Sequence, residues 1–325
     1  MVLTLNTHRG INLFTPAIQQ TRTSFWLTSL ILLASGGCSV ERKPGDFEVT
    51  EAGKPQVFVV NYPLAYFARE IGDEQVSVHF PVPEDQDPAY WNPDAATINL
   101  YQEADLILLN GANYARWINL VSLPHSKMVN TSESIEQQYI EIEDTVTHQH
   151  GPNGEHSHKG LAFTTWLDLN IAILQARAIK EALTALLPDE ASQFQRRFEK
   201  LEAELENLDR TLMTAAAKKE MLPLIGSHPV YQYLSRRYRL NLRSVHWEPD
   251  RGPTKADWDA FDKLFNDHPA VAMLWEAEPL ADVRAELHAR GVSVIVFTPS
   301  GNVPGDGDFL AAMKQNVDRL ETVFD

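Results

Sequence analysis

The 325-residue chain contains a single cysteine, Cys38, and comparatively few basic residues. A lone cysteine excludes a disulfide framework within the chain and any zinc site built from several cysteines. Lysine and arginine number 28 against 44 aspartate and glutamate residues, which leaves a net charge of -16. Such a surface repels nucleic acid and anionic lipid, and it attracts cations. We therefore expect no nucleic-acid partner.

Sequence motifs of common enzymes are also absent. The chain contains no HExxH metalloprotease helix, no GxSxG nucleophile turn, no Walker phosphate loop and no GxGxxG dinucleotide motif. Pairs of carboxylates do occur, but they are expected by chance among 44 acidic residues. The sequence therefore predicts a protein that is not an enzyme, with a metal-dependent hydrolase as the least favoured alternative.

An apolar run near the amino terminus is short. The segment "FWLTSLILLASGG" (25–37) follows Arg22, ends in small residues and immediately precedes Cys38. About a dozen apolar residues are typical of a signal peptide and too few to span a membrane comfortably. "ASGGC" resembles the site at which bacterial lipoproteins are cleaved and lipidated, although Ser35 stands where leucine is usual. We predict an exported lipoprotein anchored through Cys38; the alternative is an uncleaved amino-terminal anchor.

Short apolar segments alternate with helical patterns in two stretches of the chain. In the first stretch, "QVFVVN", "QVSVHFPV" and "DLILLNG" are bounded by turn residues, which is typical of buried strands. The second stretch repeats the alternation from "LPLIGS" onward. Apolar strands that alternate with helices predict mostly parallel sheets flanked by helices. The expected fold class is therefore α/β, with two lobes.

A long helical pattern lies between the two stretches. Apolar residues from Phe194 to Ala215 recur at alternating spacings of four and three, which predicts a narrow buried stripe. The helix is expected to begin at Asp189, a credible N-cap, and to run for about 30 residues, or roughly 45 Å. We interpret it as a rigid spacer that joins the lobes; the alternative is a coiled-coil arm.

These patterns divide the chain into six segments. In order they are a signal peptide (1–37), a lipidated tether (38–54), an amino-terminal α/β lobe (55–135), a His-rich loop (136–165), a helical segment with the linking helix (166–220) and a carboxyl-terminal α/β lobe (221–325). In open α/β sheets, ligands lie outside the carboxyl ends of the strands. If the lobes face each other, the loops after their strands form one cleft.

Two histidines follow predicted strands of the second lobe. His228 comes directly after "LPLIGS" and before a helix expected to begin near Pro229, and His246 lies at the end of "LNLRSVHW". Neutral imidazole is a ligand of Zn²⁺, Cu²⁺ and Ni²⁺, and nearby carboxylates would add oxygen ligands. Both histidines are therefore candidate metal ligands.

Three segments resemble the metal-type solute-binding proteins of ABC transporters, which are zinc- and manganese-binding lipoproteins. "DPAYWNPDAATINLYQEADLILLNGANYARWI" (87–118) is similar to the first metal-site segment of that family, "TTWLDLNIAILQARAIKEAL" (164–183) to the second and "GSHPVYQYLSRRYRL" (226–240) to the third. The resemblance extends over nearly the whole chain after the leader. It implies two lobes that hold one metal ion at their interface and deliver it to a membrane permease.

The ligand set that the resemblance implies is largely replaced. The first two histidines of the family align with Ala89 and Thr164, and its final aspartate aligns with Thr298. The third histidine is retained as His228, and histidine at this place implies zinc, with Mn²⁺ or another divalent ion as alternatives. One imidazole cannot form a tight zinc site, because zinc needs about four donors.

Other side chains at the strand ends could replace the lost donors. We predict Asp87 and His246 as substitute metal ligands beside His228. Candidate cleft-lining residues are the aromatic and acidic side chains Tyr90, Trp91, Trp166, Trp247, Trp275, Glu276 and Glu278. Aromatic clefts with few polar groups suit organic ligands, so the alternative function is capture of an organic solute or a metal chelate after loss of the ancestral metal site. For Trp166 and Trp275, packing between the lobes is the competing interpretation.

Halfway along the chain, "HQHGPNGEHSHKG" (148–160) carries His148, His150, His156 and His158 without an apolar residue. Flexible imidazoles would hold metal weakly and exchange it fast, and the resemblance implies a zinc-collecting loop at this place. The alternative is a solvated linker that binds metal only adventitiously. Together these predictions describe a monomeric lipoprotein of the bacterial cell envelope that binds a divalent metal or small solute and has a permease as its partner.

Overall fold

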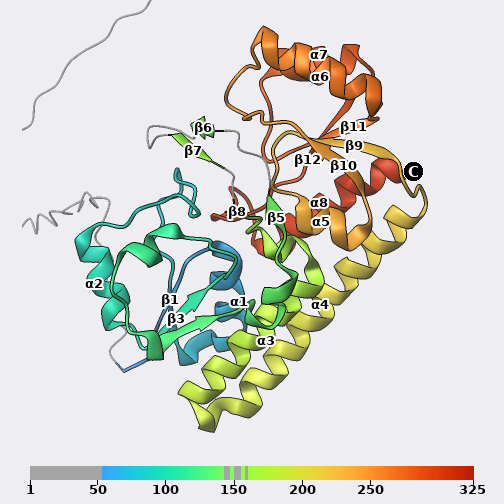
Figure 1. Cartoon of the computed structure of the whole chain (residues 1–325). Helices are drawn as coiled ribbons and strands as arrows, with labels where there is room; N and C mark the ends of the chain where they lie inside the picture. Colours follow the sequence, from blue (N-terminus) through green and yellow to red (C-terminus); the bar gives the residue numbers. More distant parts are fainter. Residues whose placement is uncertain (1–52, 143–146, 150–154, 158–159) are drawn as a thin grey trace, which may run out of the picture. The chain divides into compact units, whose positions relative to one another are not determined.

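The computed structural model describes residues 53–142, 147–149, 155–157 and 160–325 (Figure 1). These residues belong to one compact unit, Val49–Asp325. The predicted signal peptide and the predicted lipidation site Cys38 lie outside the described residues, as do His150 and His158. Within the described ranges, no helix combines the length and the apolar character needed to cross a membrane.

The first sheet contains four parallel strands in the order β2-β1-β3-β4. The strands are β1 (Gln56–Val59), β2 (Ser77–His79), β3 (Leu106–Leu109) and β4 (Met128–Asn130). They are accompanied by helices α1 (Tyr62–Gly72) and α2 (Ala95–Glu103). Asn61 begins α1 by accepting a hydrogen bond from the Leu64 amide, and Phe58 of β1 packs against Tyr101 of α2 with ring centroids 4.9 Å apart.

The second sheet repeats this plan with four parallel strands in the order β10-β9-β11-β12. The strands are β9 (Pro223–Gly226), β10 (Asn241–Ser244), β11 (Ala272–Trp275) and β12 (Ser293–Val296). The helices are α5 (Gln232–Tyr238), α6 (Lys255–Asp267), α7 (Ala281–Ala289) and α8 (Phe309–Phe324). The predicted α/β fold with two parallel sheets is confirmed.

Helices α3 (Leu169–Leu186) and α4 (Ala191–Ala217) lie side by side in Figure 1 and connect the two sheets along the chain. Most of the apolar stripe of α4, including Phe194, Leu201 and Leu205, is buried, and Leu208 is half-buried. It packs against α1, α3 and α8, so α4 is the predicted linking helix and not a coiled-coil arm. The helix begins two residues after the predicted start at Asp189, because 188–190 form a 3-10 turn that Pro188 opens.

Two further predicted elements are shorter than expected. The strand predicted for "QVSVHFPV" ends at His79, since Pro81 and Pro83 follow and proline has no N–H to donate to a neighbouring strand. The helix expected near Pro229 begins only at Gln232, because the backbone first turns tightly, with the Val230 amide donating to the His228 carbonyl.

Two hydrophobic cores lie on the two faces of the second sheet. Successive side chains of a strand point to opposite faces. Leu274 accordingly joins the larger core, which also contains α1, α3, α4 and α8, whereas Met273 and Trp275 join a smaller core with Phe261 of α6 and Leu287 of α7. The larger core includes residues of both sheets, so the two lobes share one continuous apolar interior.

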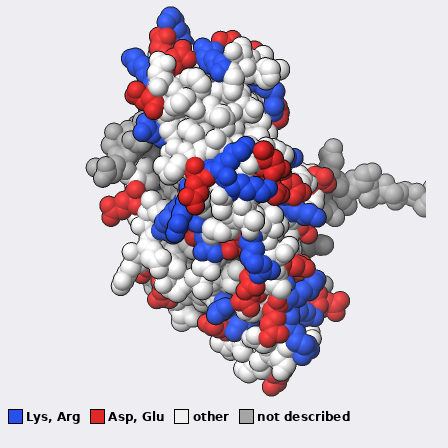
Figure 2. All heavy atoms as spheres, turned by 90° about the vertical axis from the view of Figure 1, so that its right-hand side faces the viewer, with Lys and Arg blue, Asp and Glu red and all other residues white. Residues whose placement is uncertain are grey.

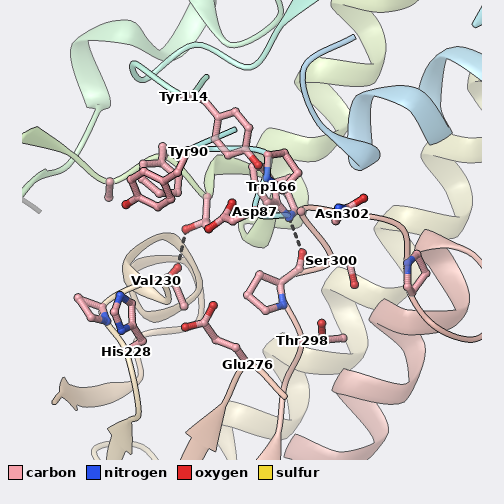
Figure 3. A pocket seen from close by; sticks show the side chains of 18 of the residues that line it. Asp87, Tyr90, Tyr114, Trp166, His228, Val230, Glu276, Thr298, Ser300 and Asn302 are labelled. Atoms are coloured by element: carbon pink, nitrogen blue, oxygen red, sulfur yellow. Dashed lines mark hydrogen bonds between the residues drawn. The ribbon is translucent and has the colours of Figure 1, made fainter. Parts of the chain in front are cut away.

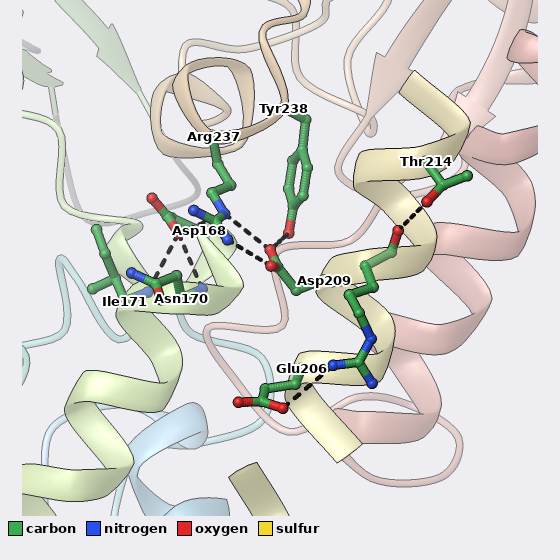
Figure 4. A network of polar contacts seen from close by, with 9 residues as sticks. Asp168, Asn170, Ile171, Glu206, Asp209, Thr214, Arg237 and Tyr238 are labelled. Atoms are coloured by element: carbon green, nitrogen blue, oxygen red, sulfur yellow. Dashed lines mark hydrogen bonds and ion pairs between the residues drawn. The ribbon is translucent and has the colours of Figure 1, made fainter. Parts of the chain in front are cut away.

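A polar network connects helix α5, beside the second sheet, to the two long helices α3 and α4 (Figure 4). Arg237 of α5 makes a bidentate contact with Asp209 of α4, at 2.9 Å from Nε and 2.5 Å from Nη2. Its Nε also lies 3.7 Å from Asp168, whose carboxylate caps α3 by accepting from the Asn170 amide. The Tyr238 hydroxyl donates to Asp209 at 3.0 Å. Three helices therefore meet at one guanidinium.

Charged side chains of both signs are intermixed on the face shown in Figure 2. Many of the described ion pairs are exposed, such as Arg210 with Glu206 on α4, and pairs of this kind contribute about 0–1 kcal/mol each. These exposed pairs therefore contribute little to the stability of the fold.

Candidate solute-binding site

A cavity of about 320 Å³ lies where the carboxyl ends of strands from both sheets meet (Figure 3). The first sheet's side contributes Asp87 and Tyr90 from the loop after β2 and Tyr114 from the loop after β3. Further lining residues come from the segment before α3 and from the loops after β9, β11 and β12, and they include Phe163, Thr164, Trp166, His228, Glu276 and 298–305. The cavity thus lies where the strand-end rule predicts a ligand site.

His228 is held at the cavity by the turn that follows β9. Its side chain is almost fully buried, with 1% of the residue exposed, and the imidazole Nδ1 lies 3.4 Å from Oε1 of Glu248. His246 does not line the cavity but contacts the His228 ring edge-on, with centroids 5.8 Å apart.

Asp87 opens a tight turn that presents two polar side chains to the cavity. Its carboxylate accepts a hydrogen bond from the Ala89 amide at 2.9 Å, and its carbonyl accepts from the amides of Tyr90 and Trp91. Burial raises the pKa of the Tyr90 phenol far above its usual value, and the carboxylates of Asp87 and Glu276 raise it further. Tyr90 is therefore a neutral phenol at physiological pH.

The three positions at which the resemblance implies lost ligands are all tied into the fold, and two of them, Thr164 and Thr298, also line the cavity. Ala89 is buried in the core, and the Thr164 hydroxyl donates to the Val230 carbonyl at 2.5 Å, which joins the segment before α3 to the loop after β9. The Thr298 backbone is bound on both sides by the amide of Asn316 in α8. Among the residues that the structure describes, no three His, Cys, Asp or Glu side chains lie close enough together to hold a metal ion.

Aromatic rings form one wall of the cavity. Tyr114 packs edge-on against Trp166 at 5.6 Å and against Phe163 at 5.3 Å, and Tyr90 meets Phe163 at 6.1 Å. The Trp166 indole donates from Nε1 to the Pro299 carbonyl at 2.7 Å. Trp166 therefore lines the cavity and also packs the segment before α3 against the loop after β12. Both interpretations of this residue, cleft lining and packing, apply.

Four predicted cleft-lining residues lie elsewhere. Trp91 is buried edge-on against Trp117, Trp247 packs with Trp258 and Phe261, Trp275 belongs to the smaller core, and Glu278 pairs with Arg284 at 2.6 Å on the surface. For Trp275 the physical reason is the alternation of side-chain direction at a strand end. It places Glu276 in the lining while its neighbour Trp275 points into the core.

Several lining residues were not predicted from the sequence. Tyr114 lies in a loop whose neighbours Ala112, Asn113 and Ala115 all have positive φ, a conformation that no motif in this segment indicates. Ser300, also at positive φ (55°), lies in the loop after β12. The strand-end rule indicates that loop but cannot distinguish Ser300 within it.

The His-rich segment begins and ends at the cavity wall. Short strands β5 (Glu141–Ile142) and β8 (Gly160–Leu161) pair with each other, and Ile142 and Ala162 line the cavity. Between them, β6 (Thr147–Gln149) and β7 (Glu155–Ser157) pair in antiparallel register with His148 opposite His156.

Comparisons with known proteins agree with this architecture. The model of the family described as "Zinc-uptake complex component A periplasmic" matches residues 57–323. The high-affinity zinc uptake system protein ZnuA of Bacillus subtilis is 25% identical over 305 residues, which cover 90% of this chain and 93% of that protein. The zinc-binding lipoprotein AdcA of Streptococcus pneumoniae is 23% identical over 316 residues, which cover 94% of this chain and 61% of that protein.

A solved structure shows the same fold. The metal-dependent lipoprotein YcdH of Bacillus subtilis matches with a TM-score of 0.69 at 21% identity, over 83% of this chain and 98% of that one. At this identity the likeness establishes the arrangement of strands and helices, and the chemistry of the cavity has to be argued from its own residues.

Proposed function

The chain belongs to the family of the periplasmic component A of zinc-uptake complexes, and we propose from this that it captures a divalent metal ion, zinc first, in the cavity between its two sheets. It would then deliver the ion to the permease of an ABC importer. The observation that carries the proposal is the burial of His228 at a strand end in that cavity, with the carboxylates of Asp87 and Glu276 in the same lining.

The donor types suit zinc. Zn²⁺ binds imidazole nitrogen and carboxylate oxygen at about 2.0–2.2 Å. His228 is the proposed central ligand, Asp87 would add an oxygen donor, and His246 would act through its contact with the His228 ring or as a further ligand. Because the described side chains supply fewer than three clustered donors, the remaining donors would come from outside this part of the chain.

Two further parts of the proposal concern the segments outside the described residues. Lipidation at Cys38 would tether the protein to a membrane of the cell envelope, and the His-rich segment would collect zinc near the cavity wall from which it extends. The protein would work as a monomer that docks on its permease, and it is not an enzyme.

We expect chelator-stripped protein to bind zinc with one-to-one stoichiometry in a calorimetric titration and to lose at least tenfold in affinity, or about 1.4 kcal/mol, on His228→Ala. His288→Ala, which removes an exposed histidine of α7, is the matched control and should bind zinc like the parent protein.

A version that lacks residues 148–158 separates the cavity from the His-rich segment. One-to-one binding that survives this deletion and disappears in His228→Ala would place the ion in the cavity. If the heat of zinc binding disappears with residues 148–158 and is unchanged in His228→Ala, the cavity is not a zinc site, and the protein would then be a binding protein for an organic solute.

A further inference from the structure

We infer that Asn302 is a positioning residue that controls release from the cavity. Its side-chain amide connects the turn 83–87 of the first lobe to the loop after β12, and a bound solute leaves when this contact opens. The inference rests on the proposed capture of a solute in this cavity and adds the step that limits its release. Three features support it: the hydrogen bonds of the amide, the anchoring of its loop and the exposure of the turn that it holds.

The Asn302 amide donates hydrogen bonds from one lobe to the other. Its Nδ2 lies 2.7 Å from the Pro83 carbonyl and 2.8 Å from the Gln86 carbonyl, with the Glu84 carbonyl farther away at 3.4 Å. Its Oδ1 accepts from the Val303 amide at 2.7 Å, which assigns the nitrogen to the side of the carbonyls. Asn302 and Pro83 are 219 positions apart in the chain, so this contact forms only when the two lobes come together.

The loop that carries Asn302 is anchored on the first half of the chain. The Gly301 carbonyl accepts from the Tyr62 amide at the start of α1 at 2.9 Å, and the Pro299 carbonyl accepts from the Trp166 indole at 2.7 Å. A side chain on an anchored segment has less conformational freedom to lose when it makes a hydrogen bond. Asn302 is therefore the fixed side of the contact.

The turn 83–87 is the side that can move. Its two ends continue into buried residues, since Val82 is 6% exposed and Ala89 is 2% exposed. Between them, Glu84 and Asp85 are exposed. Exposed loop tips with few buried contacts open locally at a low cost in free energy. The turn can therefore move about its buried ends while the first sheet stays in place.

Both sides of the contact line the cavity. Gln86 and Asp87 of the turn belong to the wall, as do Asn302 and Val303 of the loop. Figure 3 shows Asn302 and the buried His228 on opposite sides of the cavity. Val303 is 42% exposed, so the contact lies toward the solvent. Its opening would separate the turn from the loop at the cavity wall and leave His228 in place.

The expected strength of the contact suits a step that controls release. One hydrogen bond within a protein shifts an equilibrium by about fivefold, so the two short bonds of the amide favour the closed turn by about thirtyfold. A solute that leaves only while the turn is open leaves at a rate proportional to the open fraction. Loss of the two bonds should therefore speed release and leave the global stability of the fold nearly unchanged.

Asn302→Asp tests the inference, because it keeps the shape of the side chain and replaces the donor by a carboxylate that repels the carbonyls. We expect zinc to leave this variant about tenfold faster than the parent protein, or faster still. The measurement is a stopped-flow experiment in which a fluorescent chelator binds the released ion. Asn302→Ala removes the donor without adding charge and should release zinc at an intermediate rate. The melting temperatures of both variants should stay close to that of the parent protein.

Asn92→Asp is the matched control. It adds the same charge to the same loop, but Asn92 is exposed, does not line the cavity and donates to the Tyr90 carbonyl within that loop at 3.3 Å. Its rate of zinc release should equal that of the parent protein. Faster release from Asn92→Asp as well would mean that added charge, and not the Asn302 contact, controls the rate.

Hydrogen–deuterium exchange tests the same contact in the absence of zinc. In Asn302→Asp, amides of the segment 83–91 should exchange about fivefold faster than in the parent protein, or faster still, while those of α4 are unchanged. A general loss of stability would instead speed exchange in both places.

The remaining outcomes separate the two proposals. Equal release rates for Asn302→Asp and the parent protein would overturn the inference and leave the proposed metal capture intact. Unchanged exchange in the segment 83–91 would overturn it whether or not the protein binds zinc. Failure of the parent protein to bind zinc would overturn the proposed function, and faster local exchange in Asn302→Asp would then support the same contact for a different solute.

Discussion

Replacing Trp166 by alanine is expected to lower the free energy of unfolding by about 3–5 kcal/mol, the loss typical of a fully buried aromatic side chain. Trp166 is 1% exposed, packs edge-on against Tyr114 and donates from its indole to the Pro299 carbonyl at 2.7 Å. The substitution removes the ring and leaves that carbonyl without its partner. Chemical denaturation followed by circular dichroism measures the effect.

The size of this loss matters because Trp166 connects distant parts of the chain. It precedes α3, and its partner Pro299 lies after β12, with Gly301 of the same loop also close to its ring. Trp166→Phe is the matched control, since it keeps a buried aromatic ring but loses the hydrogen bond and part of the indole, for an expected loss of about 1–2 kcal/mol. If the alanine variant lost no more than the phenylalanine variant, the ring would not be holding the cavity wall together.

Arg237→Ala is expected to cost about 2–4 kcal/mol at neutral pH. The guanidinium touches two carboxylates that are shielded from water, Asp209 in a bidentate contact and Asp168 at 3.7 Å, with side-chain exposures of 13% and 9%. Its removal leaves both charges without the cation, and breaking a buried pair is costly for that reason. The Arg237 side chain is itself 29% exposed, so water screens part of the interaction and the estimate lies below that for a fully buried pair.

The pH dependence of this loss follows from Asp168. Burial raises the pKa of the Asp168 carboxyl above its ordinary value of 3.8, and Arg237 opposes that rise. A raised pKa in the folded state means that the stability contributed by the protonated carboxyl is complete below 3.8 and is lost as the pH rises through the folded-state pKa. Without Arg237 the pKa rises further, so the difference between variant and parent should be largest at neutral pH and shrink as the pH falls toward 4.

Arg210→Ala provides the control for both the size and the pH dependence. Arg210 lies on the same helix as Asp209 and pairs with Glu206 at 3.3 Å, but both side chains are more than half exposed. Its loss should cost about 0.5 kcal/mol or less. A comparable loss for the two arginine variants would contradict the role given to the network around Arg237.

The strands and helices were predictable because their patterns are local. Segments such as "DLILLNG" and the apolar stripe from Phe194 to Ala215 contain their periodicity within a few turns or strand residues, and the structure confirms β3 and α4 there. The errors were local as well. Proline shortened β2 at Pro81, and a tight backbone turn at Val230 delayed α5.

The site was predictable only in part. His228 was found because a histidine directly after a buried strand lies at the edge where parallel sheets bind ligands, and it does line the cavity. Tyr90, Trp166 and Glu276, predicted from the same strand ends, line it too. Ser300 carries no comparable sequence pattern.

The sequence by itself determined the α/β class, the linking helix and the position of His228, because each depends on the periodicity or order of neighbouring residues. Only the tertiary structure decided that Trp166 lines the cavity while Trp275 lies in a core, and that Ser300 comes to the same wall as Trp166. Those outcomes depend on which faces of separate elements pack together. Pairs such as Trp166 and Pro299, 133 residues apart, meet only after the two sheets have packed around their shared core.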